Sequence, residues 1–207
     1  MGDVKTRRQV AAEQTQRAIV EAAARLFAQN GYQPTSIARI AADAGVAVQT
    51  VYNSIGGKRE LLSRVLDFAA AGDQAPMRVP EFMRHRVEAE TDPHRIIDQL
   101  VDFWQDALAR TAPVFRILRE AAAVDPEAAA LERERAARRM SNYGHAAAIL
   151  AARGALRSEL TIQTAAATIF AIGHPETYRT LVIDGSWDVQ RWATWARTSL
   201  YNALLSS

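Results

Sequence analysis

Residues 36–58 constrain the fold of this chain more than any other stretch, because two short amphipathic segments meet there at a glycine. Apolar residues recur at helical spacing on one side of each segment. Gly45 separates the segments, and glycine enters the left-handed backbone region of a sharp turn without steric cost. The apolar positions are Ile37, Ile40, Ala41, Val46 and Val51. The pattern predicts two short helices joined by a tight turn, a helix-turn-helix.

Helices are also predicted on both sides of this motif. Residues 15–30 carry one apolar stripe, with Thr15 as a candidate N-cap and Gly31 as the residue that ends the helix. Two consecutive glycines end the helical pattern after the motif, and a further helix is predicted to begin at Lys58. We therefore expect the motif to lie in a small helical domain whose other helices cover its inner face.

The outer face of the second motif helix carries side chains suited to reading DNA. Glutamine can pair bidentately with adenine, threonine can bond a base edge or a phosphate, and valine can touch a thymine methyl group. Hydroxyl groups, a lysine and a helix N-terminus suit phosphate oxygens. The expected DNA contacts are Thr35, Ser36, Arg39, Ala47, Val48, Gln49, Thr50, Tyr52 and Lys58. Any one of these residues is equally compatible with a solvated helix surface, but their combination predicts DNA binding.

Charge supports this prediction only weakly. The net charge of the chain is +2, and residues 1–62 hold eight Lys and Arg against five Asp and Glu. A positive excess is what phosphate contact requires. A solvated surface with a chance excess explains the charge alone at least as well.

The composition predicts an all-α protein. The 207 residues are 49% hydrophobic and 23% charged, alanine is abundant, and there are only ten glycines and seven prolines. The absence of cysteine excludes disulfides, thiolate metal sites and a cysteine nucleophile. No uncharged run approaches the roughly 20 apolar residues of a membrane span, and the charged N-terminus is no secretory signal. We expect a cytoplasmic protein without a membrane partner.

Two domains are predicted, with a change to Gly, Asp, Gln and Pro around residues 70–80 as the linker. The first, residues 1–62, is a three-helix helix-turn-helix DNA-binding domain with a basic N-terminal arm. The second, residues 63–207, is a helical domain for effector binding and dimerisation. Its predicted helices cover about 80–90, 93–110, 113–123, 126–153, 161–184 with a bend at Pro175, and 187–205.

The N-terminal residues resemble a known family over about 50 positions. The residues that carry the resemblance are Thr15–Ile19, Ala23, Leu26–Phe27, Gly31–Tyr32, Thr35–Ile37, Ile40–Ala41, Ala44–Val46, Thr50–Tyr52 and Lys58–Leu61. Together they are similar to the N-terminal domain of the TetR family of transcriptional regulators. One departure is Ile55, where the family usually has phenylalanine; an apolar side chain still fills the position, so we expect a local packing change only.

The resemblance implies an all-α homodimer in which the last two helices pair across a two-fold axis. Apolar stripes on both of these helices are compatible with this arrangement, and a two-fold dimer matches a palindromic operator. The alternative is that both stripes belong to the internal core. The candidate interface residues are Ile169, Ile172, Trp192, Ala196, Leu200 and Leu204.

The resemblance also implies a cavity for a small-molecule effector among the middle helices. Aromatic residues could line it, with an arginine as polar anchor. The alternative is that aromatics at helical spacing belong to the core. The candidate ligand-binding residues are Phe103, Trp104, Phe115, Arg119, Tyr143, Phe170 and Tyr178.

Catalysis and metal binding find no support in the pattern of residues. The four histidines have no ligand spacing, and no phosphate-binding loop or serine elbow occurs. We expect no catalytic residue, no metal and no cofactor. The sequence therefore predicts a ligand-responsive repressor of double-stranded operator DNA, acting as a homodimer that a small-molecule effector releases. The alternative is a helical small-molecule-binding protein or enzyme whose N-terminal unit mediates protein contacts.

Overall fold

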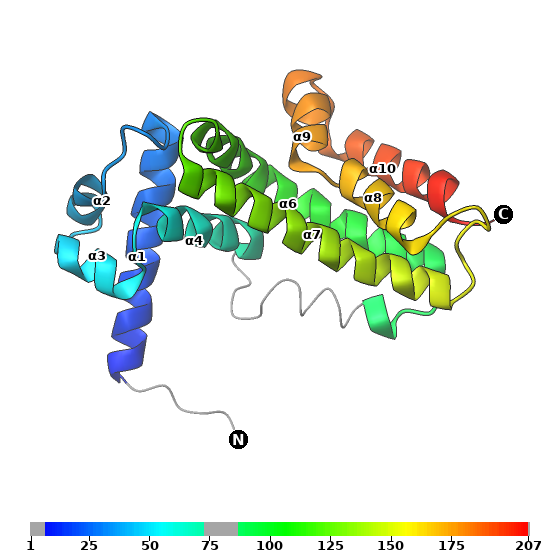
Figure 1. Ribbon diagram of the computed structural model, residues 1–207, viewed down its shortest axis with the longest axis horizontal. Helices are drawn as coiled ribbons and strands as arrows, with labels where there is room; N and C mark the ends of the chain where they lie inside the picture. The colour runs from blue at the N-terminus through cyan, green and yellow to red at the C-terminus, as the bar shows by residue number, and fades with distance from the viewer. Residues whose placement is uncertain (1–6, 73–86, 207) are drawn as a thin grey trace. The chain divides into compact units, whose positions relative to one another are not determined.

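The computed structural model describes residues 7–72 and 87–206, and within these ranges the protein is built of helices with no strand (Figure 1). The helices are α1 (Arg7–Asn30), α2 (Ile37–Asp43), α3 (Val48–Ser54), α4 (Lys58–Ala71), α6 (Pro93–Ala122), α7 (Pro126–Ala152), α8 (Ile162–Ile172), α9 (Pro175–Tyr178) and α10 (Val189–Leu204). A π-helical segment, Arg179–Asp184, follows α9. The predicted all-α class is confirmed. The expected basic arm, the linker and the helix over 80–90 lie wholly or mostly outside the described residues.

The chain divides into two compact units, and each is assembled from two segments of the sequence. The N-terminal unit comprises the residues up to Ala69 together with Pro113–Glu132. The C-terminal unit comprises Ala70–Ala112 together with the residues from Arg133 onward. Helices α6 and α7 therefore each contribute to both units.

The core of the N-terminal unit gathers the apolar faces of the helix-turn-helix and its neighbours. Ile19 from α1, Ile40 from α2 and Val51 from α3 are fully buried in it. Leu118 from α6 and Leu131 from α7 complete this core. Burial of side chains of this size stabilises a fold by about 1.5–3 kcal/mol each, so the α6 and α7 residues contribute substantially to the stability of the N-terminal unit.

Local signals explain most helix ends in this unit. Gly31 (φ +80°) follows α1 and Gly45 (φ +68°) follows α2, both in the left-handed region. Ser36 caps α2, since its hydroxyl accepts a hydrogen bond from the Arg39 N–H. The predicted start of α1 was wrong. This helix begins at Arg7, and the Thr15 hydroxyl donates to the Ala11 carbonyl inside it.

Helix α6 runs unbroken through Pro113, where the sequence predicted two separate helices. Proline has no N–H, so the carbonyl of Ala109 loses its helical partner. Both residues are exposed, so water can replace the missing bond. Apolar side chains before and after Pro113 are buried in the cores of the two units, which favours continuation of the helix.

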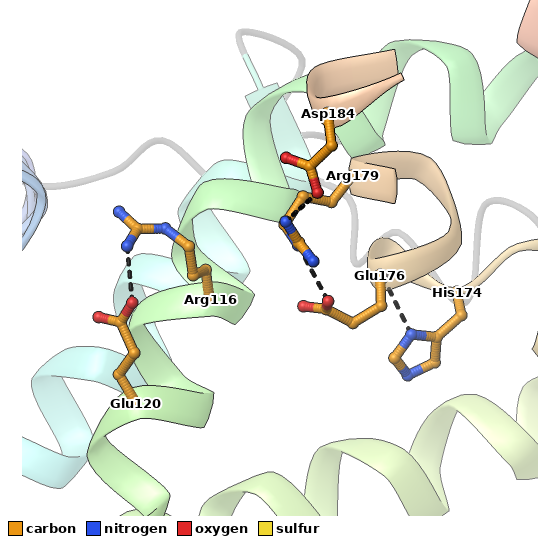
Figure 2. A network of polar contacts seen from close by, with 6 residues as sticks. All are labelled: Arg116, Glu120, His174, Glu176, Arg179 and Asp184. Carbon is orange, nitrogen blue, oxygen red and sulfur yellow. Dashed lines mark hydrogen bonds and ion pairs between the residues drawn. The ribbon is translucent and has the colours of Figure 1, made fainter. Parts of the chain in front are cut away.

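The single bent helix predicted over 161–184 is instead three elements. Helix α8 ends at Ile172, because the residue before a proline disfavours helical backbone and His174 is extended (φ −74°, ψ 137°). The His174 ring then caps α9 by accepting from the Glu176 N–H at 3.1 Å. Figure 2 shows Arg179 between the carboxylates of Glu176 and Asp184, spanning the π-helical segment.

The C-terminal unit has its own core around two buried tryptophans, Trp104 on α6 and Trp192 on α10. Trp192 packs edge-on against Tyr178, with ring centroids 5.1 Å apart. Gly173 lies directly against the Trp104 indole, so a β-carbon there would come within 2.7 Å of Cη2. Helices α8 and α10 pack against each other (Figure 1).

Candidate nucleic-acid interface

The turn between α2 and α3 is held by main-chain hydrogen bonds that fix how α3 leaves it. The N–H of Gly45 donates to the Ala42 carbonyl at 3.2 Å, and that of Val46 donates to the Ala41 carbonyl at 2.9 Å. Ala41 itself is buried, which allows the two helices to cross closely. The orientation of α3 is therefore set by backbone geometry and by its buried Val51.

The opposite face of α3 is open to solvent. Val48 is 42% and Tyr52 50% exposed, so two large side chains lie on this solvent-facing side. Ala47 and Gln49 are also exposed, whereas Thr50 is half-buried. Four of the predicted contact residues thus share one accessible surface.

Within this surface Gln49 already has a partner. Its side-chain nitrogen donates to the Asn53 Oδ1 at 2.9 Å, one helical turn later. Asn53 completes the exposed face but is not among the predicted contacts. A base that pairs with Gln49 would replace this intrahelical bond, so binding exchanges one hydrogen bond for another.

A long-range hydrogen bond that was not predicted holds the end of α3. The amide of Gln16 on α1 donates to the Ser54 carbonyl at 3.0 Å. No local pattern in the sequence indicates this long-range bond. It ties the last turn of α3 to the long first helix.

Thr35 is a correction to the predicted contact set. Its residue is fully buried, and its hydroxyl donates to the carbonyl of Gly31 at 2.8 Å, with Leu26 at 3.3 Å. The hydroxyl therefore satisfies carbonyls at the end of α1 and faces away from solvent. Ser36 and Arg39 remain exposed at the start of α2.

Lys58, at the first position of α4, is half-buried and held against the loop after α1. Its ammonium donates to the Gln33 carbonyl at 3.1 Å and lies 4.2 Å from the Tyr32 ring centroid. Burial lowers the pKa of Lys58, and the negative charge of Asp125 opposes this shift. The sequence predicted the lysine as a DNA contact but did not indicate these partners.

Tyr32 is the centre of this local arrangement. Burial is the main cause that raises the pKa of its hydroxyl to about 12, and the carboxylates of Asp125 and Glu127 add to the effect. The Asp125 carboxylate lies close to the Tyr32 hydroxyl. Asp125 also caps α7, since its Oδ1 accepts from the Glu127 N–H at 2.8 Å. The turn between α6 and α7 therefore reaches the residues around Lys58 within the N-terminal unit.

Five of the six predicted dimer-interface residues require a correction. Within the single chain Ile169, Trp192, Ala196, Leu200 and Leu204 have no exposed surface, and Ile172 is only partly exposed. Residues already enclosed in the core cannot also form a face for a partner. The apolar stripes that suggested an interface are the internal core of the C-terminal unit.

The other side of α10 is accessible and contains a surface hollow. Trp195 is partly exposed in this hollow and packs edge-on against Trp187, with centroids 6.2 Å apart. Thr194, Thr198 and Asn202 are exposed along the same side. This accessible side of α10 is called the α10 outer face below.

The predicted ligand-binding residues divide between the two units. Phe115 packs against the core of the N-terminal unit, and Arg119 is exposed on the same unit, so neither belongs to the aromatic cluster. In the C-terminal unit, Tyr143 lies between Trp104 and Phe170, with ring centroids 5.7 and 6.3 Å away. Burial raises the pKa of the Tyr143 hydroxyl.

Two further predicted residues lie in the C-terminal core. Phe103 is half-buried, and Tyr178 is buried against Trp192. Arg139 adds a cation to the cluster, 5.3 Å from the Phe170 ring centroid, and was not predicted. These side chains bring aromatic surface and positive charge together in one part of the unit.

Over residues 7–72 and 87–206 no group of three acidic or histidine side chains could hold a metal ion. No helix in these ranges is long and apolar enough to cross a membrane.

Comparison with family models identifies the N-terminal residues. Residues 19–65 match the model described as bacterial regulatory proteins, tetR family. The match spans α2, α3 and most of α4 and includes the second half of α1. No curated protein sequence matches the chain significantly.

Solved structures extend the likeness of fold to nearly the whole chain. NalD from Pseudomonas aeruginosa, the secondary repressor of the MexAB-OprM multidrug efflux pump, is 22% identical with a TM-score of 0.73, over 95% of this chain and 99% of NalD. The fatty acid degradation regulator FadR from Bacillus halodurans is 21% identical with a TM-score of 0.73, over 90% and 94%. SmeT, in a complex with triclosan, is 18% identical with a TM-score of 0.72, over 93% and 92%.

Proposed function

Since the chain belongs to the TetR family through its N-terminal domain, we propose that it is a transcriptional repressor. It binds a palindromic operator in cytoplasmic DNA as a homodimer, and a small-molecule effector releases it. The observation that carries the proposal is the accessible face of α3. Val48, Gln49 and Tyr52 are exposed on this face, while the opposite face of the helix is buried in the core of the N-terminal unit. In a two-fold dimer, two such helices would enter successive major grooves about 34 Å apart.

The exposed face of α3 carries no charged residue. We therefore propose that some of the predicted contact residues read bases and that others bind phosphates. Gln49 and Val48 read base edges by a bidentate hydrogen bond and a methyl contact. Ser36, Arg39, Tyr52 and Lys58 bind phosphates, which fixes register without selecting sequence.

Two substitutions test this division on an operator selected by the wild-type protein from random palindromic DNA. Lys58→Gln is expected to weaken binding to all sequences and to reduce the slope of log K against log salt by about 0.9 per lysine. Gln49→Ala is expected to leave the slope unchanged and to lose roughly 1–3 kcal/mol of discrimination at one base pair of each half-site. Fluorescence anisotropy over a salt series measures both quantities.

Arg95→Gln is the control, because Arg95 is exposed on α6 in the C-terminal unit. It should bind as the wild type does. If Lys58→Gln binds the operator with the wild-type affinity and slope, the phosphate role of this lysine is wrong. The alternative function, a small-molecule binder or enzyme, predicts that wild-type protein shows no salt-dependent binding to any of these duplexes.

For the dimer we propose the α10 outer face with the adjoining side of α8. Ala167 and Ala171 are exposed on α8, and Thr194 and Thr198 on α10, so short side chains line both helices and permit close approach. Trp195 adds a large partly exposed aromatic surface of the kind that anchors interfaces.

For the effector we propose an apolar aromatic compound that binds at Trp104, Tyr143 and Phe170. This proposal rests on the aromatic cluster of the C-terminal unit. The effector binds more tightly to a conformation of the protein that has low operator affinity than to the conformation that binds the operator. The operator affinity falls to the extent that these two effector affinities differ.

A thermal-shift screen of small aromatic compounds, with triclosan among them, tests the effector proposal. A binding compound is expected to raise the melting temperature and to lower operator affinity. Phe170→Ala should abolish both effects while operator affinity without the compound stays unchanged. A panel in which stabilising compounds leave operator binding untouched would contradict the proposed release mechanism.

A further inference from the structure

The turn between α6 and α7 contacts the residues that surround Lys58. Asp125 is in this turn and caps α7, while Tyr32 follows the first helix and Lys58 opens α4. All three lie in the N-terminal unit. The Asp125 carboxylate lies close to the Tyr32 hydroxyl, and the Tyr32 ring lies against the Lys58 ammonium.

We propose that Tyr32 and Asp125 are positioning residues for Lys58, which hold its ammonium in place for a DNA phosphate. This inference rests on the proposed function, because it gives these residues a role in the phosphate contact of the regulator. Neither residue is expected to touch DNA itself.

The position of the Lys58 ammonium is fixed from two sides. The Gln33 carbonyl accepts one of its three N–H donors at 3.1 Å, and the Tyr32 ring centroid lies 4.2 Å away. Two donors therefore remain for a phosphate. A free lysine side chain carries about 2 kcal/mol of rotamer entropy. An ammonium that is already fixed loses less of this entropy on binding.

Tyr32 is itself packed inside the N-terminal unit. Its ring lies against Phe27, with centroids 5.5 Å apart, and its hydroxyl lies close to the Asp125 carboxylate. Asp125 is held in turn by the first N–H groups of α7, from Glu127 at 2.8 Å and Ala128 at 3.3 Å. Lys58 is thus positioned by Tyr32, and the Tyr32 ring packs against Phe27 of α1.

Charge and position can be separated by the choice of variant. Asp125→Asn removes the charge but keeps an acceptor and a good N-cap. Asp125→Ser keeps the cap, but its shorter side chain cannot extend to the Tyr32 hydroxyl. Tyr32→Phe removes only that hydroxyl and retains the ring beneath Lys58. Glu127→Gln is the matched control, since Glu127 acts on Tyr32 only through its charge.

Each variant is measured alone and together with Lys58→Gln, as a double-mutant cycle on operator affinity. In the wild-type background, Tyr32→Phe and Asp125→Ser should each weaken binding about 2- to 10-fold, the range for loss of one hydrogen bond. Asp125→Asn and Glu127→Gln should stay within about 2-fold. In the Lys58→Gln background, Tyr32→Phe should have no further effect, and only Lys58→Gln should reduce the salt slope.

Urea denaturation of each variant separates positioning from loss of fold, because a purely packing role would lower the stability of the unit without coupling to Lys58. The inference is overturned if Tyr32→Phe weakens binding equally in both backgrounds. It is also overturned if Asp125→Asn and Glu127→Gln weaken binding as much as Asp125→Ser, since charge alone would then explain the effect. Failure of the wild-type protein to bind any operator is a different result, which removes the proposed function itself.

Discussion

Trp195→Arg is expected to convert the protein to a monomer and to weaken operator binding by roughly 10²–10⁴-fold, the gain that linking two binding modules provides. Trp195 lies partly exposed in the hollow of the α10 outer face. An arginine in a two-fold interface occurs once in each subunit, so two like charges are removed from water in the same interface. Light scattering or sedimentation gives the mass, and anisotropy gives the affinity.

Met140→Arg is the control for added charge, because Met140 is exposed on α7 and no proposed contact involves it. It should leave both mass and affinity unchanged. A dimeric Trp195→Arg protein that retains operator affinity would show that another surface pairs the subunits. A monomer with wild-type affinity would contradict the requirement for two half-sites.

Gly173→Ala is expected to destabilise the C-terminal unit by about 1–3 kcal/mol or more, the usual result of overpacking a core. The new β-carbon would come within 2.7 Å of Cη2 of Trp104, whose rigid indole is buried. The backbone at the end of α8 would have to shift. Thermal and urea denaturation measure the change in stability.

Two further variants make this prediction specific. Gly144→Ala is the matched control, because a β-carbon at Gly144 in α7 meets no atom within 4 Å. It should stabilise the protein by roughly 0.5–1 kcal/mol through the better helix propensity of alanine. Combining Gly173→Ala with Trp104→Leu should cost less than the sum of the two single changes. If the change in the free energy of unfolding of the double variant equals the sum of the two single changes, Gly173→Ala does not act through a clash with Trp104.

The helix-turn-helix could be predicted from the sequence because its determinants are local. Gly31, Ser36 and Gly45 each fix a helix end through their own backbone or side chain, with no help from distant residues. Thr15 shows where such signals fail. A threonine can cap a helix or bond back to the preceding turn, and the sequence does not say which applies.

Residues that depend on tertiary partners could not be predicted in the same way. The periodic apolar residues of α8 and α10 indicated burial correctly, but periodicity does not say whether the covering surface belongs to the same chain or to a partner. Trp192 and Leu200 are enclosed within one chain. Likewise, nothing local to Phe115 indicates that it packs in the N-terminal unit.

The same argument applies to the residues around Lys58. Asp125 follows Lys58 by 67 positions in the sequence, and its only local signal is that of an N-cap for α7. Its contact with Tyr32 arises from the way the N-terminal unit is assembled from separate segments. A sequence pattern that treats each helix by itself has no access to such a contact.

The composition of the N-terminal unit has a consequence for recombination between related regulators. Leu118 and Leu131 complete its core, although more than 40 positions separate Ala69 from Pro113 in the sequence. A chimera that exchanges only the first segment would join a foreign surface to these leucines and leave a mismatched core. Transfer of operator specificity should therefore succeed either by exchanging both segments together or by replacing single residues on the exposed face of α3.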